Sequence, residues 1–116
     1  MISGTHVVIF SKKPEADRAF FRDVLGFKSV DAGRGWLIFA LPPAEAAFHP
    51  SDKNGVHELY LMCDDLEAEM TSLAKKNVKF SKIREAPWGS IAKMQLPGGG
   101  GVPLYQPKHP TAFGLK

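Results

Sequence analysis

The chain has little cysteine. Its 116 residues include one cysteine, Cys63, so no disulfide can form within the chain. Such scarcity is typical of proteins that work in a reducing compartment. Cys63 ends an apolar run just before Asp64, and nothing in the sequence around it would favour the thiolate. We therefore expect Cys63 to be a buried, unreactive thiol rather than a nucleophile.

Long apolar runs are also missing. No stretch approaches the roughly 20 residues that a helix needs to cross a bilayer. Residues 1–4 lack the basic and apolar regions of a signal peptide. Together these absences predict a cytoplasmic protein that has no membrane partner.

The chain has only a small excess of positive charge, with a formal net charge of +3. Nucleic-acid binding needs a recognition element besides basic residues, and the chain has no helix-turn-helix, zinc-finger or RNP pattern. We therefore interpret its basic residues as a solvated surface and expect no nucleic-acid partner. Five of the 15 lie close together at the end of the second predicted helix and beyond it: Lys75, Lys76, Lys79, Lys82 and Arg84.

What the chain does have is an internal repeat. The order of landmarks in the first half returns in the second: Trp36 corresponds to Trp88, 52 residues later, and Leu41 corresponds to Leu96, 55 residues later. Repeats of this length indicate a duplicated supersecondary unit. The chain is long enough for one domain only, so we expect a single domain over residues 1–116. Its first module would span about 4–50, a polar joint 51–55, and its second module about 56–110.

Each module is predicted to be a βαβββ unit. Apolar spacing predicts helices over residues 14–25 and 66–76. Gly26 and Asn77 are suited to end these helices, and Asp64 is suited to begin the second. A strand rather than a helix follows Gly98, which favours a hairpin turn over a phosphate-binding loop. Strands are predicted at 5–11, 27–31, 35–41, 44–49, 57–63, 79–85, 88–96 and 101–106.

Motifs over nearly the whole chain resemble the vicinal oxygen chelate superfamily, which includes glyoxalase I, extradiol dioxygenases and bleomycin-resistance proteins. They are residues 6–9 (HVVI), 20–27 (FFRDVLGF), 64–66 (DDL), 96–99 (LPGG) and 104–107 (LYQP). The second half is most similar to small bacterial proteins described as extradiol-dioxygenase-like. The resemblance implies an α+β fold whose two βαβββ modules form a curved, mixed half-barrel sheet with helices on the outside.

The resemblance also implies four inward positions that bind a divalent metal (Fe, Mn, Zn or Ni) in the metal-dependent relatives. In this chain they are His6, Ala46, Glu58 and Pro103. Alanine and proline side chains cannot coordinate a metal, so His6 and Glu58 are the ligands that remain. A catalytic metal usually has three protein ligands. Glu58 would be a metal ligand or the catalytic base.

A slip in strand register offers a second set of ligands. Side chains alternate across a strand, so Glu45 and His49 face away from the site in the expected register. A bulge after the prolines at 42–43 would turn both residues inward, beside His6. Otherwise Glu45 and His49 are surface residues near the joint between the modules.

Residues on the expected inner face also define a possible cavity for a small organic molecule. The same positions would equally suit an interior filled by its own side chains. They are His6, Val8, Phe48, Glu58, Tyr60 and Tyr105.

Two functions follow from the resemblance. The first is a small-molecule-binding protein that uses a metal for dioxygenase-type or glyoxalase-type chemistry. The alternative is a metal-free binder that sequesters its ligand, as bleomycin-resistance proteins do. The basic charge balance favours an acidic or phenolic ligand over a cationic one. Exposed sheet edges and the pairing of modules in relatives predict a homodimer.

Overall fold

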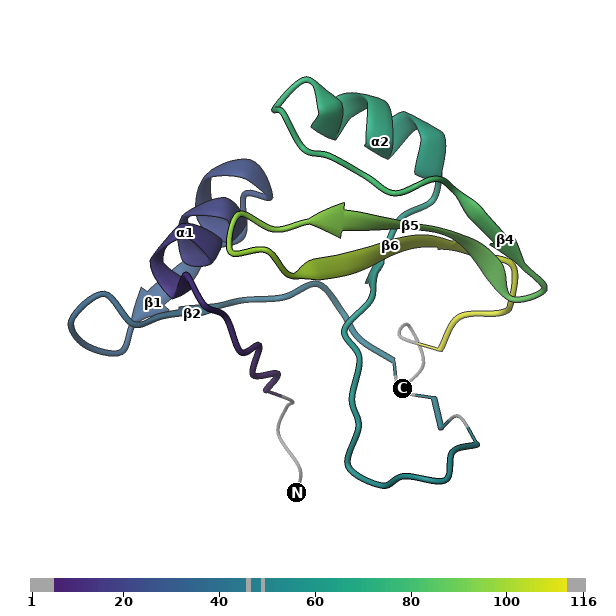
Figure 1. The fold of residues 1–116 in the computed structure, drawn as a ribbon, viewed down its shortest axis with the longest axis horizontal. Helices are drawn as coiled ribbons and strands as arrows, with labels where there is room; N and C mark the ends of the chain where they lie inside the picture. Colours follow the sequence, from purple (N-terminus) through teal and green to yellow (C-terminus); the bar gives the residue numbers. More distant parts are fainter. Residues whose placement is uncertain (1–5, 46, 49, 113–116) are drawn as a thin grey trace.

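The computed structural model describes residues 6–45, 47–48 and 50–112, which form a mixed α+β fold with two helices and two sheets (Figure 1). A two-stranded hairpin follows the first helix, and a four-stranded sheet carries the second helix on one face. Within these ranges neither helix is long and apolar enough to cross a membrane.

The first helix, α1 (Pro14–Ala19), begins with proline, whose missing N–H costs nothing at this position. It continues into a wider π-helical turn, η1 (Phe20–Val24), closed by a hydrogen bond of 3.1 Å from the Leu25 N–H to the Phe20 carbonyl. Gly26 then ends the helical segment with φ +76°, a left-handed conformation that suits glycine. The predicted cap at Gly26 is confirmed.

The second helix, α2 (Leu66–Ala74), begins one residue later than its expected cap implies. The Asp65 carboxylate, and not that of Asp64, accepts a hydrogen bond of 3.1 Å from the Ala68 N–H. Beyond the helix, Asn77 adopts φ +66°, as predicted for the residue that ends it. The Leu66 N–H also donates to Gln106 Oε1 at 2.9 Å, which fixes the start of α2 on the sheet.

The strands form two separate sheets. An antiparallel hairpin pairs β1 with β2, and the larger sheet has the order β3-β6-β5-β4. The β3–β6 pair is parallel, whereas β6–β5 and β5–β4 are antiparallel. The strands are β1 (Ser29–Asp31), β2 (Leu37–Phe39), β3 (Leu61–Met62), β4 (Arg84–Ala86), β5 (Gly89–Gln95) and β6 (Gly101–Pro107).

The core lies between the helical segments and one face of the larger sheet. Leu66 from α2 is 1% exposed and packs on Ala92 and Leu104, while Met94 is completely buried among residues of η1 and β6. Burying a side chain of this size contributes about 1.5–3 kcal/mol. Even-numbered residues of β5 and β6 therefore face the helices, and odd-numbered residues such as Ile91 and Tyr105 face the other way.

A polar tie joins α1 to the turn between β5 and β6. Asp17 accepts a hydrogen bond of 2.7 Å from the Gly98 N–H and a second of 2.6 Å from the Ser11 hydroxyl. A Cβ at position 98 would lie 2.6 Å from an Asp17 oxygen and 2.8 Å from the Ser11 oxygen. Only glycine therefore leaves room for this contact between the two halves of the chain.

Two predicted strands of the first module are not strands in the structure. Residues 6–10 and the described part of 44–49 make no strand pairing, so the expected half-barrel of two modules is not confirmed. Apolar sequence favours an extended conformation, but a strand also needs a neighbour to complete its hydrogen bonds. The described residues that connect β2 to β3 instead extend away from the larger sheet as a long loop (Figure 1).

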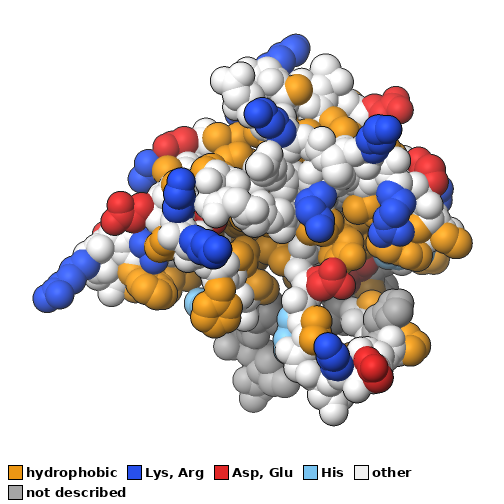
Figure 2. Space-filling view, viewed as in Figure 1, with side chains coloured by type: hydrophobic (Ala, Val, Ile, Leu, Met, Phe, Trp, Pro, Cys, Tyr) orange, Lys and Arg blue, Asp and Glu red, His pale blue; other side chains and the backbone are white. Residues whose placement is uncertain are grey.

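The unpaired segments leave large apolar side chains exposed. Phe10 is 95% exposed, Phe48 is 100% exposed, and Val8 is 63% exposed. Hydrophobic surface is visible where the main body of the molecule meets this loop, whereas the basic side chains are scattered over the same view (Figure 2). An uncovered apolar surface of this kind commonly marks an interaction site.

Candidate functional site

Three aromatic rings meet on the face of the larger sheet that the helices leave open. The ring centroids lie 6.0 Å apart for Tyr60 and Trp88, 5.5 Å for Tyr60 and Tyr105, and 5.6 Å for Trp88 and Tyr105. Each pair is close to perpendicular, with interplanar angles of 81°, 86° and 74°. Such edge-to-face pairs contribute about 0.5–1.5 kcal/mol each. We call these three residues the aromatic cluster.

The sheet topology brings these rings together from distant parts of the chain. Tyr60 directly precedes β3, and Tyr105 lies on the neighbouring strand β6. Trp88 occupies the turn between β4 and β5, next to Gly89. A Cβ at Gly89 would lie 2.9 Å from the Gln106 carbonyl oxygen and 3.0 Å from the Tyr105 ring. Glycine at this position therefore allows the turn to approach β6 closely.

Charged groups border the exposed side of the cluster. The Arg84 guanidinium carbon lies 6.0 Å from the centre of the Trp88 ring, at the limit of a cation–π contact. Burial raises the pKa of the Tyr60 phenol, and the negative charge of Glu58 raises it further, whereas Arg84 opposes the shift. Tyr60 therefore lies between a carboxylate and a guanidinium, and its phenol stays protonated at neutral pH.

The opposite side of the cluster is covered by the C-terminal segment. The His109 ring lies 6.1 Å from the Tyr105 ring, and its Nε2 is 3.3 Å from the Tyr105 hydroxyl. Its Nδ1 is 2.7 Å from the Pro110 carbonyl oxygen, which can only accept, so Nδ1 carries a proton. In neutral His109 the other nitrogen, Nε2, then accepts from the Tyr105 hydroxyl.

Glu45 fixes the same segment from the first half of the chain. Its Oε1 accepts a hydrogen bond of 2.7 Å from the Ala112 N–H, and its Oε2 lies 3.9 Å from His109 Nε2. Burial raises the pKa of the Tyr105 phenol, and the charge of Glu45 adds to the effect. A catalytic relay would place the carboxylate on Nδ1 and the phenol on Nε2. Here both groups approach Nε2, so the arrangement holds a segment in place and does not activate a nucleophile.

The residues expected to bind a metal make no contact with one another by hydrogen bond or ion pair in the part of the chain that the structure describes. His6 is exposed and makes no hydrogen bond or ion pair with another described residue. Glu58 lies beside Tyr60, and Glu45 is engaged by Ala112. Ala46 and His49 lie outside the described residues. Within the described ranges no group of three possible ligands occurs, which is the number that a catalytic metal usually takes from the protein.

Of the residues expected to line a cavity, Tyr60 and Tyr105 meet in the aromatic cluster, whereas Val8 and Phe48 are exposed. Trp88 and His109 complete the site, although the sequence did not identify them as site residues. In the sequence, Trp88 is only a landmark of the repeat. Both repeat tryptophans stand beside a glycine, and this was the one feature that could have indicated a role for Trp88. His109 lies after the last predicted strand and had no signal in the sequence.

The thiol of Cys63 does not take part in the chemistry of the site. It donates to the Tyr105 carbonyl oxygen at 3.6 Å. Burial, reinforced by the charge of Glu69, raises the pKa of Cys63 to about 11. Because the thiolate is the reactive form, a thiol with this pKa is unreactive at neutral pH, as the sequence predicted.

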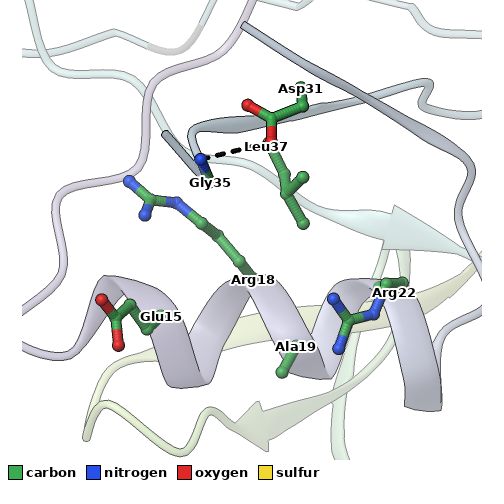
Figure 3. A pocket seen from close by; sticks show the side chains of 7 residues that line it. All are labelled: Glu15, Arg18, Ala19, Arg22, Asp31, Gly35 and Leu37. Carbon is green, nitrogen blue, oxygen red and sulfur yellow. Dashed lines mark hydrogen bonds between the residues drawn. The ribbon is translucent and has the colours of Figure 1, made fainter. Parts of the chain in front are cut away.

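A separate groove of about 300 Å³ lies between α1 and the β1–β2 hairpin (Figure 3). Three of its charged side chains already have partners. Arg22 pairs with Asp23 at 2.7 Å, the Asp31 carboxylate accepts from the Gly33 and Gly35 N–H groups, and Arg18 lies 4.8 Å above the Trp36 ring. We therefore regard the aromatic cluster as the better candidate site. The residues that line the groove are Glu15, Arg18, Ala19, Arg22, Asp31, Gly35 and Leu37.

The fold and the site define an α+β protein whose helices cover one sheet face and whose other face presents aromatic residues. The chain belongs to the glyoxalase/bleomycin resistance protein/dioxygenase superfamily, whose family model matches residues 5–99. Members of this superfamily often bind divalent metals. A comparison with curated proteins finds no match.

Solved structures share this fold. The antibiotic binding protein TnmS3 from Streptomyces sp. CB03234 is 25% identical, with a TM-score of 0.64 over 93% of this chain and 100% of its own. Lactoylglutathione lyase from Agrobacterium tumefaciens is 16% identical, with a TM-score of 0.63 over 89% and 92%. A superfamily member from Sphaerobacter thermophilus DSM 20745 is 22% identical, with a TM-score of 0.59 over 90% and 97%.

Proposed function

We propose that this protein binds a small planar organic molecule, acidic or phenolic, against the aromatic cluster, without transforming it. The proposal rests on one observation: the rings of Tyr60, Trp88 and Tyr105 converge on the face of the larger sheet that neither described helix covers. Aromatic side chains with a few convergent polar groups are typical of small-molecule sites. Trp88 is 38% exposed, so its ring has surface available for a ligand.

The charges beside the cluster suggest the polarity of the ligand. Arg84 is exposed next to Trp88 and offers a planar, permanently charged donor for a carboxylate or phenolate. Glu58 lies next to Tyr60 and would accept a hydrogen bond from a ligand hydroxyl. The pair therefore favours an aromatic ligand that carries both an acidic group and a hydroxyl. Likeness to an antibiotic binding protein supports a binding role.

The rival proposal is a metal-dependent enzyme of the dioxygenase or glyoxalase type. It rests on the expected ligands His6 and Glu58, and would also need a third group, such as His49 or a residue of a second copy. The aromatic cluster needs no such completion in order to bind a ligand. We therefore favour binding without catalysis.

Calorimetric titration with salicylate tests the proposal, because salicylate is planar and carries a carboxylate beside a phenol. We expect saturable binding that weakens about 2- to 10-fold in Trp88→Ala, the range that one aromatic contact supplies. Trp36→Ala is the matched control, because Trp36 lies beside Arg18, away from the cluster, and its replacement should leave the affinity unchanged. Equal binding by both variants would contradict the proposed site.

Two further measurements go beyond aromatic stacking: the first tests whether Arg84 recognises the charge of the ligand, and the second tests whether the protein holds a metal. Arg84→Met keeps an apolar stem but removes the charge, so it should weaken salicylate binding while leaving the weaker binding of neutral salicylamide unchanged. Elemental analysis of the purified protein should find no stoichiometric iron, manganese, zinc or nickel. One bound metal per chain, lost in His6→Ala, would favour the enzyme.

We also propose that the molecule acts as a homodimer with two-fold symmetry. Strand β3 is an edge of the larger sheet. Residues 6–10 correspond to it in the repeat; residues 7–10 are apolar and exposed, and the segment pairs with no strand among the described residues. The first strand of a second copy has the sequence and length to lie along this edge. Such pairing would extend the sheet toward the expected half-barrel.

A further inference from the structure

The segment formed by residues 108–112 crosses the sheet face on which the aromatic cluster lies. After β6 the chain turns back beneath the sheet, on the side away from α2 (Figure 1). The Lys108 N–H donates to the Trp88 carbonyl oxygen at 2.9 Å, and the Lys108 ammonium pairs with Glu85 at 2.7 Å. We call this segment the C-terminal strap.

The strap covers one member of the cluster and leaves another open. His109 lies over Tyr105 and bonds to its hydroxyl, and Tyr105 is only 8% exposed. Trp88, in contrast, is 38% exposed on the same face. The planar His109 ring, with its hydrogen-bonding nitrogen, thus occupies a position on Tyr105 that an aromatic ligand would use.

The far end of the strap is held only weakly. Beyond Lys108, its polar contacts with the other described residues are the long Tyr105–His109 hydrogen bond of 3.3 Å, one hydrogen bond from the Ala112 N–H to Glu45, and the 3.9 Å approach of His109 to Glu45. A single hydrogen bond contributes only about 0.5–1.5 kcal/mol of net stability, because water replaces it when it breaks. Residues 109–112 can therefore separate from the sheet while Lys108 stays attached.

We propose that the C-terminal strap is an internal competitor for the ligand site, in which His109 occupies Tyr105 until a ligand displaces it. The inference rests on the proposed binding function and adds its regulation. Removing His109 should expose the Tyr105 hydroxyl and the adjoining ring, so that a ligand no longer has to break an existing contact. The strap thereby lowers affinity for compact ligands and excludes those that cannot replace its hydrogen bond.

Salicylate titration of strap variants tests this inference. We expect His109→Ala to bind salicylate about 2- to 10-fold more tightly than wild type, because one neutral hydrogen bond no longer competes. Ala112→Pro removes the N–H that donates to Glu45 and should act in the same direction. His57→Ala is the matched control, since His57 is exposed and makes no hydrogen bond or ion pair with another described residue. Unchanged or weaker binding by His109→Ala would overturn the inference.

A ligand-free measurement distinguishes failure of the strap from failure of the proposed function. Acetylation of tyrosines by N-acetylimidazole, followed by peptide mass spectrometry, reports the exposure of each phenol. Tyr105 should react several-fold faster in His109→Ala than in wild type, whereas Tyr60 should react at the same rate in both. If Tyr105 becomes reactive but no variant binds salicylate, the ligand proposal fails and the strap stands. If the Tyr105 rate does not change, the strap is wrong whatever binds.

Discussion

Tyr60 and Tyr105 are the two tyrosines of the chain, so the absorbance change of phenol ionisation reports on the candidate site alone. Burial raises the pKa of both, with added contributions from the charges of Glu58 and Glu45 respectively. We therefore expect both to ionise above the ordinary pKa of about 10 in the folded protein, and near about 10 in urea.

The raised pKa values of the two phenols make the folded protein less stable at high pH. The folded state holds both phenolic protons more tightly than the unfolded state, so this contribution to the free energy of unfolding is complete below about pH 10. It is lost as the pH rises through the raised values. Glu58→Gln should lower the pKa of Tyr60 and leave that of Tyr105 in place. If both phenols of the folded protein ionised at the pKa found in urea, the cluster would not be buried in solution.

Among the elements, the turn between β5 and β6 allows the sharpest test of packing, because two of its glycines differ in their surroundings. A Cβ at Gly98 meets Asp17 and Ser11, whereas a Cβ at Gly100 meets nothing within 4 Å. We expect Gly98→Ala to lower the free energy of unfolding by about 1–3 kcal/mol, in the usual range for a disrupted buried contact. Gly100→Ala should change it little. Urea denaturation measures both, and equal effects would mean that the Asp17 tie contributes nothing.

Elements governed by local interactions were predictable from the sequence. Proline at the start of α1, glycine after η1 and asparagine after α2 act within a few residues, and the structure has each where expected. Strands β5 and β6 are a hairpin and nearly match their predicted ranges. Residues 6–10 and the described part of 44–49 are not strands, because apolar alternation indicates a preference for extended backbone, while pairing depends on a distant neighbour.

The candidate site was predictable only where it follows strand alternation. Counting alternate residues places Tyr60 and Tyr105 on one face, and their rings lie 5.5 Å apart. Trp88 lies in a turn and His109 in an irregular segment, where no periodicity connects sequence to direction. The role of Glu45 as an anchor for Ala112 likewise depends on a contact between distant segments.

For the whole molecule, exposed apolar surface at residues 6–10 predicts self-association. We expect a dimer mass by light scattering at micromolar concentration, and a shift toward monomer in Val8→Asp, because a charge would be buried at the new interface. Val30→Asp is the control, since Val30 is also exposed but lies on the β1–β2 hairpin. A monomer mass for the wild-type protein would exclude the dimer.

The position of β6 between β5 and β3 has a consequence for the time course of folding. The β5–β6 hairpin closes a short loop, whereas β3 must find β6 across the whole of α2, β4 and β5. Closing a longer loop costs more chain entropy, so the parallel pair should form after the hairpin. Trp88 and Tyr105 would meet early, and Tyr60 would join them last. Stopped-flow fluorescence of Trp88, measured in a Trp36→Phe background, should show the arrival of Tyr60 as a late phase. The ability to bind would then appear only with the final step of folding, and a ligand would select chains that have completed it.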